Sequence, residues 1–134
     1  MMTDNGLTTI ESAHSVAETL DRLVAAITPL GMNVFARIDH AEGAAKVGML
    51  LRPTQLLLFG NPKGGTPLMQ DRQTAGIDLP LKALAWEDSG GRVWLSYNEA
   101  SWIAARHGLG AASTAAVTAM AAGLEKVTKA AAEK

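Results

Sequence analysis

The chain has 134 residues, a net charge of −1, no cysteine and 48% hydrophobic residues. This length suits one domain with a single core, and the missing cysteines exclude disulfides, thiol catalysis and cysteine-bound zinc or iron–sulfur sites. Lysine and arginine are scattered singly, so we expect no nucleic-acid partner. The polar start (residues 1–5) and the lack of an apolar run near ~20 residues predict a cytoplasmic protein with no membrane segment.

The first part of the chain predicts a strand, a helix and a second strand. Residues 7–11 are expected to form the first strand. Ser15 and Glu18 form a capping box for a helix that stops at Gly31. Residues 32–39 alternate in polarity, which is typical of a half-buried strand. The inward side chains of this strand are expected to be Met32, Val34, Ala36 and Ile38.

A short helix is expected over residues 41–46, followed by an apolar stretch over residues 54–59. Because every residue of that stretch except its start is apolar, it favours a central strand buried on both faces. A glycine- and proline-rich segment comes next, and a short helix is expected within residues 68–75. The helix start is ambiguous, because Asn61-Pro62 and Thr66-Pro67 each resemble a cap followed by proline at the first helical position.

Residues 81–87 and 92–97 flank Asp88-Ser89-Gly90-Gly91, which predicts a β-hairpin. A helix capped by Asn98 should follow and end near Gly108, and an alanine-rich helix should run from residue 111 onward. The elements together predict an α+β fold with one domain: a curved, largely antiparallel sheet of about five strands with helices on one face. The apolar seam of the last helix is Val117, Met120, Leu124, Val127 and Ala131.

Two aromatic side chains fall on the nominally polar sides of their strands. They are Phe35, on residues 32–39, and Trp94, on residues 92–97. Large aromatic residues on such a face suggest that something covers it. We expect Phe35 and Trp94 to belong to a homodimer interface, since symmetric dimers are the commonest oligomers; a shallow ligand groove and cover by a loop or helix are the alternatives.

The order of several short segments resembles the family called domain of unknown function 302 (DUF302). These segments are Asp39-His40 after an alternating strand, Gly60-Asn61-Pro62-Lys63 after an apolar strand, Thr66-Pro67-Leu68-Met69, and Asp78-Leu79-Pro80-Leu81 before a hairpin. The resemblance covers about residues 6–109 and implies a TBP-like α+β fold that often associates as a dimer. It implies no reaction. We therefore expect an N-terminal tail (1–5), a core domain (6–109) and an added alanine-rich helix (110–134).

The glycine-rich junction is the first candidate site. Gly60, Asn61, Lys63, Gly64, Gly65 and Thr66 follow a buried strand and precede a helix. Backbone amides at such a helix start can bind an anion, so a small polar or anionic ligand is expected there. The competing interpretation is a tight turn capped by Asn61, with the glycines relieving steric conflict. The junction is not a Walker A loop, because the terminal Gly-Lys-Ser/Thr of that motif is missing.

The second candidate site joins Asp39, His40 and Asp78, which could supply acid–base or metal-binding groups if they meet in space. The alternative is structural, with Asp39 or His40 capping a short helix and Asp78 capping a turn. The histidines show no paired metal spacing, and no cofactor motif is present. The leading hypothesis is therefore a homodimeric module that binds a small ligand near Gly60–Thr66. An enzyme using the three residues, or a pure interaction scaffold, are the alternatives.

Overall fold

The structure is a computed structural model that describes residues 5–134, so the N-terminal tail expected over 1–5 lies outside the described residues except for Asn5. Its centre is a five-stranded sheet with the strand order β1-β5-β4-β3-β2. Every neighbouring pair is antiparallel, which confirms the predicted α+β fold. The strands are β1 (Leu7–Ser12), β2 (Asn33–Asp39), β3 (Thr54–Gly60), β4 (Leu81–Glu87) and β5 (Val93–Asn98).

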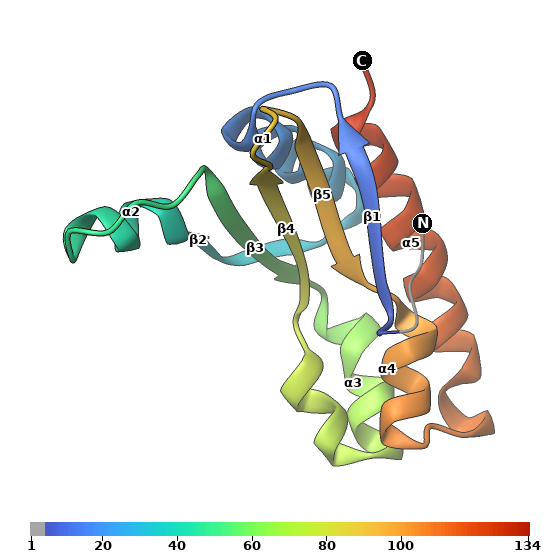
Figure 1. Ribbon diagram of the computed structural model, residues 1–134. Coiled ribbons are helices and arrows are strands. Elements are labelled where there is room, and N and C mark those ends of the chain that lie inside the picture. The colour runs from blue at the N-terminus through green and yellow to red at the C-terminus, as the bar shows by residue number, and fades with distance from the viewer. Residues whose placement is uncertain (1–4) are drawn as a thin grey trace.

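The helices cover one face of this sheet and one of its ends (Figure 1). Helices α1 (Val16–Ile27) and α5 (Thr114–Ala132) pack against each other beside the sheet, while α3 (Pro62–Asp71) and α4 (Ala100–His107) lie together at its lower end. Helix α2 (His40–Lys46) projects away from the body. Short 3-10 turns complete the chain: η1 (Thr28–Leu30), η2 (Gln73–Asp78) and η3 (Ala111–Ser113).

The core forms because apolar residues recur at helical spacing on α1 and α5 and at alternate positions on the strands. Leu57 and Phe59 of β3 point to the helices, as do alternate residues of β4 and β5. The fully buried large side chains of this core include Leu20, Leu23, Ile27, Leu57, Phe59 and Leu95. Three residues of the predicted α5 seam, Leu124, Val127 and Ala131, are buried, so α5 is part of this core.

The opposite face of the sheet, called here the outer face, is covered by no helix of the described chain. The prediction that β3 is buried on both faces was therefore wrong: Leu56 and Leu58 are only half-buried, while Leu57 and Phe59 on the helix side are buried. An apolar sequence alone could not separate the two faces. The large apolar side chains of the outer face include Ile38, Leu56, Leu58, Leu84, Trp86 and Trp94.

Strand β2 also differs from its predicted alternation. A bulge shifts its register between Val34 and Ala36, and an extra residue of this kind reverses the facing of the residues beyond it. Arg37 thus pairs opposite Leu57 on the helix side, and its guanidinium donates to Asp21 of α1 at 2.6 Å. Ile38, predicted to be inward, lies on the outer face and is exposed.

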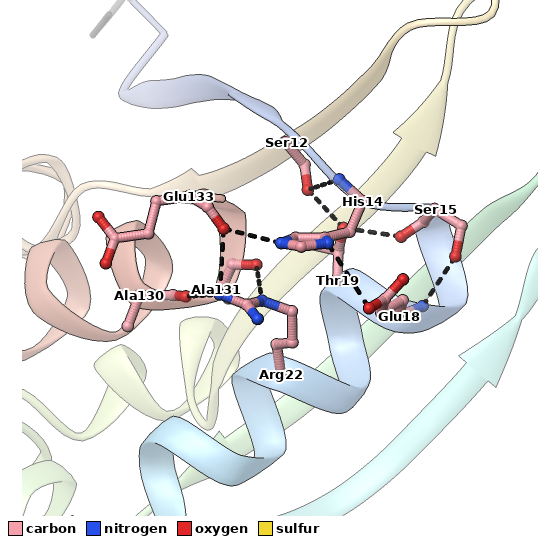
Figure 2. A network of polar contacts seen from close by, with 9 residues as sticks. All are labelled: Ser12, His14, Ser15, Glu18, Thr19, Arg22, Ala130, Ala131 and Glu133. Atoms are coloured by element: carbon pink, nitrogen blue, oxygen red, sulfur yellow. Dashed lines mark hydrogen bonds and ion pairs between the residues drawn. The ribbon is translucent and has the colours of Figure 1, made fainter.

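The end of α5 is held by hydrogen bonds from α1 and from the segment between β1 and α1 (Figure 2). The Arg22 guanidinium donates to the carbonyls of Ala130, Ala131 and Glu133, each at 3.0 Å. The His14 ring donates to the Glu133 carbonyl at 2.7 Å. These bonds satisfy carbonyls that a helix end leaves without partners, and so they fix α5 to its own domain.

Candidate functional site

A groove of about 500 Å³ opens beside the end of β3, between the sheet, α3 and α5. One wall is the junction from Gly60 to Thr66, and the opposite wall is α5. Large apolar side chains form most of the lining, and Lys63 is the one charged residue among the described residues that line it. The main apolar lining residues are Met32, Phe35, Met69, Leu79, Leu81 and Met120.

All six residues predicted to bind a ligand line this groove: Gly60, Asn61, Lys63, Gly64, Gly65 and Thr66. The ambiguous helix start is resolved in favour of Asn61, whose side chain accepts from the Lys63 amide at 2.9 Å and begins α3 at Pro62. Pro67 lies inside the helix, where it cannot donate to the Lys63 carbonyl four residues back.

The amides that an anion would need at this helix start already have partners. The Asn61 carbonyl accepts from the amides of Gly64 and Gly65 at 2.9 and 3.1 Å, and its side chain takes the Lys63 amide. An anion at this position would have to displace the cap. The geometry of the junction therefore favours the apolar groove beside it over an anion cradle made of backbone amides.

Three glycines of the groove lining, Gly64, Gly65 and Gly123, have little steric reason to be glycine. A Cβ at Gly64 or at Gly123 of α5 would meet no atom of another element within 4 Å, and at Gly65 it would only touch Leu79 at 3.5 Å. Glycine inside a helix costs about 0.5–1 kcal/mol relative to alanine. These positions thus lower helix stability while they keep the groove open.

Asp78 is buried, and it contacts two residues of α4 that the sequence did not connect with it. The Arg106 guanidinium donates to both carboxylate oxygens at 3.0 and 3.1 Å, and His107 Nε2 lies 2.6 Å from Oδ2. On the other side of the ring, His107 Nδ1 lies 3.1 Å from the Thr74 hydroxyl. The cluster joins η2 to α4, and η2 carries Gly76 of the groove wall.

This cluster resembles the hydroxyl–imidazole–carboxylate order of a catalytic triad, but Thr74, Asp78 and His107 do not line the groove. Their geometry instead positions the groove wall. No sequence spacing could reveal the cluster, since Asp78 and His107 belong to separate elements. The only sequence feature that could have indicated the cluster is the basic pair Arg106-His107 at the end of α4. A favourable interaction of basic residues with the helix dipole accounts for this pair equally well.

The structure does not bring Asp39 and His40 to Asp78. Asp39 pairs opposite Gln55 at the start of β3, and its side chain caps α2 by accepting from the Glu42 amide at 2.9 Å. Asp78 precedes Leu81, which pairs opposite Phe59 at the other end of β3. Roughly 13 Å of strand separates these ends at about 3.3 Å per residue, so the three residues share no acid–base site.

The two predicted interface residues also lie apart. Trp94 is on the outer face, where it stacks on Trp86 with ring centroids 6.2 Å apart and donates to Asp88 at 2.9 Å. Phe35 sits at the β2 bulge and lines the groove.

Lys82 also lies on the outer face. Its ammonium group donates to the carbonyls of Asp78 and Pro80, and partial burial lowers the pKa of this group.

Comparison with known proteins places this fold in a family. The model of the family "Domain of unknown function DUF302" matches residues 8–131. The chain belongs to the DUF302 family. The match runs past residue 109, the expected end of the shared domain, and includes nearly all of α5.

A crystal structure of an uncharacterized conserved DUF302 protein from Bacillus stearothermophilus superimposes with a TM-score of 0.75. The two chains are 19% identical, and 95% of each is covered. At this identity the likeness shows the shared DUF302 fold.

Two Brucella proteins are much more similar to this DUF302 chain in sequence. Fluoride-specific ion channel FluC 1 of Brucella suis is 55% identical over 126 residues, which cover 94% of this chain and 50% of that protein. FluC 1 of Brucella abortus is also 55% identical, with 47% of its length covered. The chain spans about half the length of these relatives. Over the described residues, the helices are too short or too polar to cross a membrane.

Proposed function

We propose that the chain is a small-molecule-binding module whose groove takes an elongated, mostly apolar ligand with a polar end near Lys63. The observation that carries this proposal is the groove itself. Its volume of about 500 Å³ lies within the ~300–1,000 Å³ typical of ligand sites, which are mainly apolar with a few polar groups that orient the ligand. Here Lys63, Asn61 and Thr66 are those polar groups.

Two features of the lining support an apolar ligand. Gly64 and Gly123 leave space at a cost in helix stability, and alanine at residues 116 and 119 keeps the same side of α5 shallow. Methionine is flexible and polarizable and adapts to ligands of different shape. Three methionines contribute to the lining: Met32, Met69 and Met120.

A thermal-shift series tests the ligand class. The probes are dodecanoate below its micelle-forming concentration and dodecanol below its solubility limit, with phosphate and acetate as small anions. We expect the two long-chain compounds to raise the melting temperature, because a ligand at 100 times its Kd adds about 2.7 kcal/mol to stability. Lys63→Gln should weaken dodecanoate more than dodecanol. Stabilisation by phosphate or acetate alone would restore the anionic interpretation, and no shift with any probe would contradict ligand binding of this class.

A pair of leucine substitutions on α5 locates the bound molecule. Gly123→Leu projects a side chain into the groove and should abolish the shift. Ala115→Leu, on an exposed position of the same helix outside the groove lining, should leave it intact. Equal binding by both variants would place the ligand elsewhere.

The Brucella relatives favour a second function. They are named fluoride-specific ion channels, and this chain corresponds to about half of each. We propose that the module acts as an accessory to a fluoride channel, working with the part of such a protein that the chain does not match. In a fluoride-sensitive bacterial strain, the whole Brucella suis protein should give more fluoride resistance than its unmatched part alone. Equal resistance would contradict an accessory role.

Self-association is also part of the proposed function. The uncovered outer face carries apolar side chains on β2, β3, β4 and β5, and apolar surface patches mark interaction sites. Trp94 belongs to this face, as the dimer hypothesis requires, whereas Phe35 belongs to the groove.

A further inference from the structure

Among the described residues, the segment that links β2 to β3 carries more exposed large apolar side chains than any other segment. This segment, residues 40–53, is called here the arm; it consists of α2 and the loop that follows. Its exposed apolar residues are Val47 (71% exposed), Met49 (64%), Leu50 (102%) and Leu51 (50%). A fully exposed leucine in a run of apolar neighbours is unusual on a protein surface and indicates an interaction site.

The arm does not fold back on its own domain. Figure 1 shows it extending sideways from the sheet, beyond the start of β3 and away from the helices. The loop is anchored at its base, where Arg52 donates to the Glu87 carbonyl at 3.2 Å. The described chain therefore has two uncovered apolar surfaces, the arm and the outer face, that are separated within one copy.

We propose that the chain forms a two-fold dimer in which the arm of each copy lies across the outer face of the other copy. This inference rests on the self-association in the proposed function and names its interface. A two-fold dimer makes each contact twice, so the arm of each copy is matched by the outer face of the other.

The dimensions of the two surfaces suit a stable dimer. Five strands spaced about 4.8 Å apart and six or seven residues long give a face of roughly 20 by 20 Å. Such a face offers on the order of 400 Å² in projection, and the arm adds a second contact region. The face alone thus offers about half of the ~800 Å² per partner of a standard interface, and the arm of the same copy contributes further area to the second contact.

The charges are arranged as in a stable interface, with an apolar centre and a polar rim. Residues 47–51 carry no charge, and charged side chains flank them on both sides at Glu42, Lys46 and Arg52. On the outer face, the Lys82 ammonium group donates to two backbone carbonyls at the end of the sheet nearest η2. Leu56, Leu84 and Trp86 thus present an uncharged centre to an arriving arm.

Sedimentation velocity on the full chain tests the interface with charge substitutions. The wild type should sediment as a dimer of the 14.0 kDa chain, and Leu50→Asp should raise the dimer dissociation constant at least about 100-fold, or roughly 2.7 kcal/mol. The substitution removes no contact within one copy, since Leu50 is fully exposed. Ile77→Asp, at another exposed apolar residue (73%) away from the arm and the outer face, is the control and should leave the dimer unchanged.

Cysteine cross-linking identifies which surfaces meet, and the chain has no cysteine of its own to interfere. Leu50→Cys mixed with Leu84→Cys should form a mixed disulfide dimer under mild oxidation, and neither variant alone should cross-link efficiently. Efficient cross-linking of Leu50→Cys with itself would overturn the arm-on-face arrangement. A wild type that stays monomeric at about 100 µM, a concentration at which even a micromolar dimer is formed, would overturn self-association altogether. A dimer insensitive to Leu50→Asp would overturn only the role of the arm, and neither result bears on the groove.

Discussion

Asp78 shows how much one buried carboxylate can hold in place. It is 9% exposed and accepts from Arg106 and His107 of α4. Arg106 also stacks over the Trp102 ring at 5.7 Å, so its position is fixed from two sides. Through these contacts a single side chain sets the distance between η2 and α4, and with it one wall of the groove.

Asp78→Asn should destabilise the fold by about 2 kcal/mol, since it removes the negative charge and one of the two oxygens that accept from the buried His107 ring and the half-exposed Arg106 guanidinium. Urea unfolding measures the loss. Asp21→Asn is the matched control: its exposed pair with Arg37 should contribute less than about 1 kcal/mol. Equal effects of the two substitutions would contradict the importance of the buried cluster.

Asp71 links α3 to the start of α5. Its carboxylate accepts from the Ser113 hydroxyl at 2.7 Å and the Gly110 amide at 2.9 Å, and these two bonds lower its pKa below the ordinary 3.8. The folded state therefore holds this proton less tightly than the unfolded state. The contribution of the ionised Asp71 carboxylate to folding stability is therefore complete above about pH 4, and it is lost as the pH falls through the lowered pKa.

The stability difference between the wild type and Asp71→Asn should accordingly shrink as the pH falls below about 4. Denaturant unfolding of both proteins between neutral and strongly acid pH measures this change. A difference that is constant over the whole range would show that ionisation of Asp71 does not contribute.

The end of α5 depends on a residue of α1 that is far away in sequence. Arg22 of α1 donates to three carbonyls at the end of α5 (Figure 2). The Ala13 amide donates to the Ala132 carbonyl at 2.8 Å. A helix without a glycine cap needs such partners. The clasp makes α1 and α5 one packed unit.

Arg22→Met keeps the apolar stem and removes the donors, and it should cost about 1–2 kcal/mol. Amide hydrogen exchange should accelerate in the last turn of α5 more than in α1. Arg92→Met removes a surface arginine whose carboxylate partner is 3.9 Å away, and it should stay within about 0.5 kcal/mol of the wild type. Unchanged exchange at the end of α5 would contradict the clasp.

Most strands and helices of the fold were predicted from the sequence because each carries local signals, although the helix expected within residues 68–75 spans Pro62–Asp71 instead. The capping box at Ser15, the hairpin at Asp88–Gly91 and the seam of α5 are patterns within a few turns of chain. The β2 bulge and the bare outer face depend on which elements pack together. The partners of Asp78 were missed for the same reason, because Arg106 and His107 reach it only through the fold.

Cutting the chain after residue 109, at the domain boundary expected from the sequence, tests whether α5 is an addition. Leu124, Val127 and Ala131 are part of the main core, so residues 1–109 should lack cooperative thermal unfolding and a native near-ultraviolet circular dichroism spectrum. The full chain is the control. Cooperative unfolding of the shortened chain would show that the sheet and α1 suffice.

The place of β1 at the sheet edge has a consequence for biosynthesis. Among the described strands it pairs with β5 alone, with Leu7 opposite Asn98 and Ser12 opposite Val93. A ribosome adding about 5–20 residues per second needs on the order of 5 to 15 s to make the intervening chain. During that time the first strand waits for β5, whereas β3, β4 and β5 pair with near neighbours as they emerge. We infer that folding during translation begins in this meander and that β1 is added late.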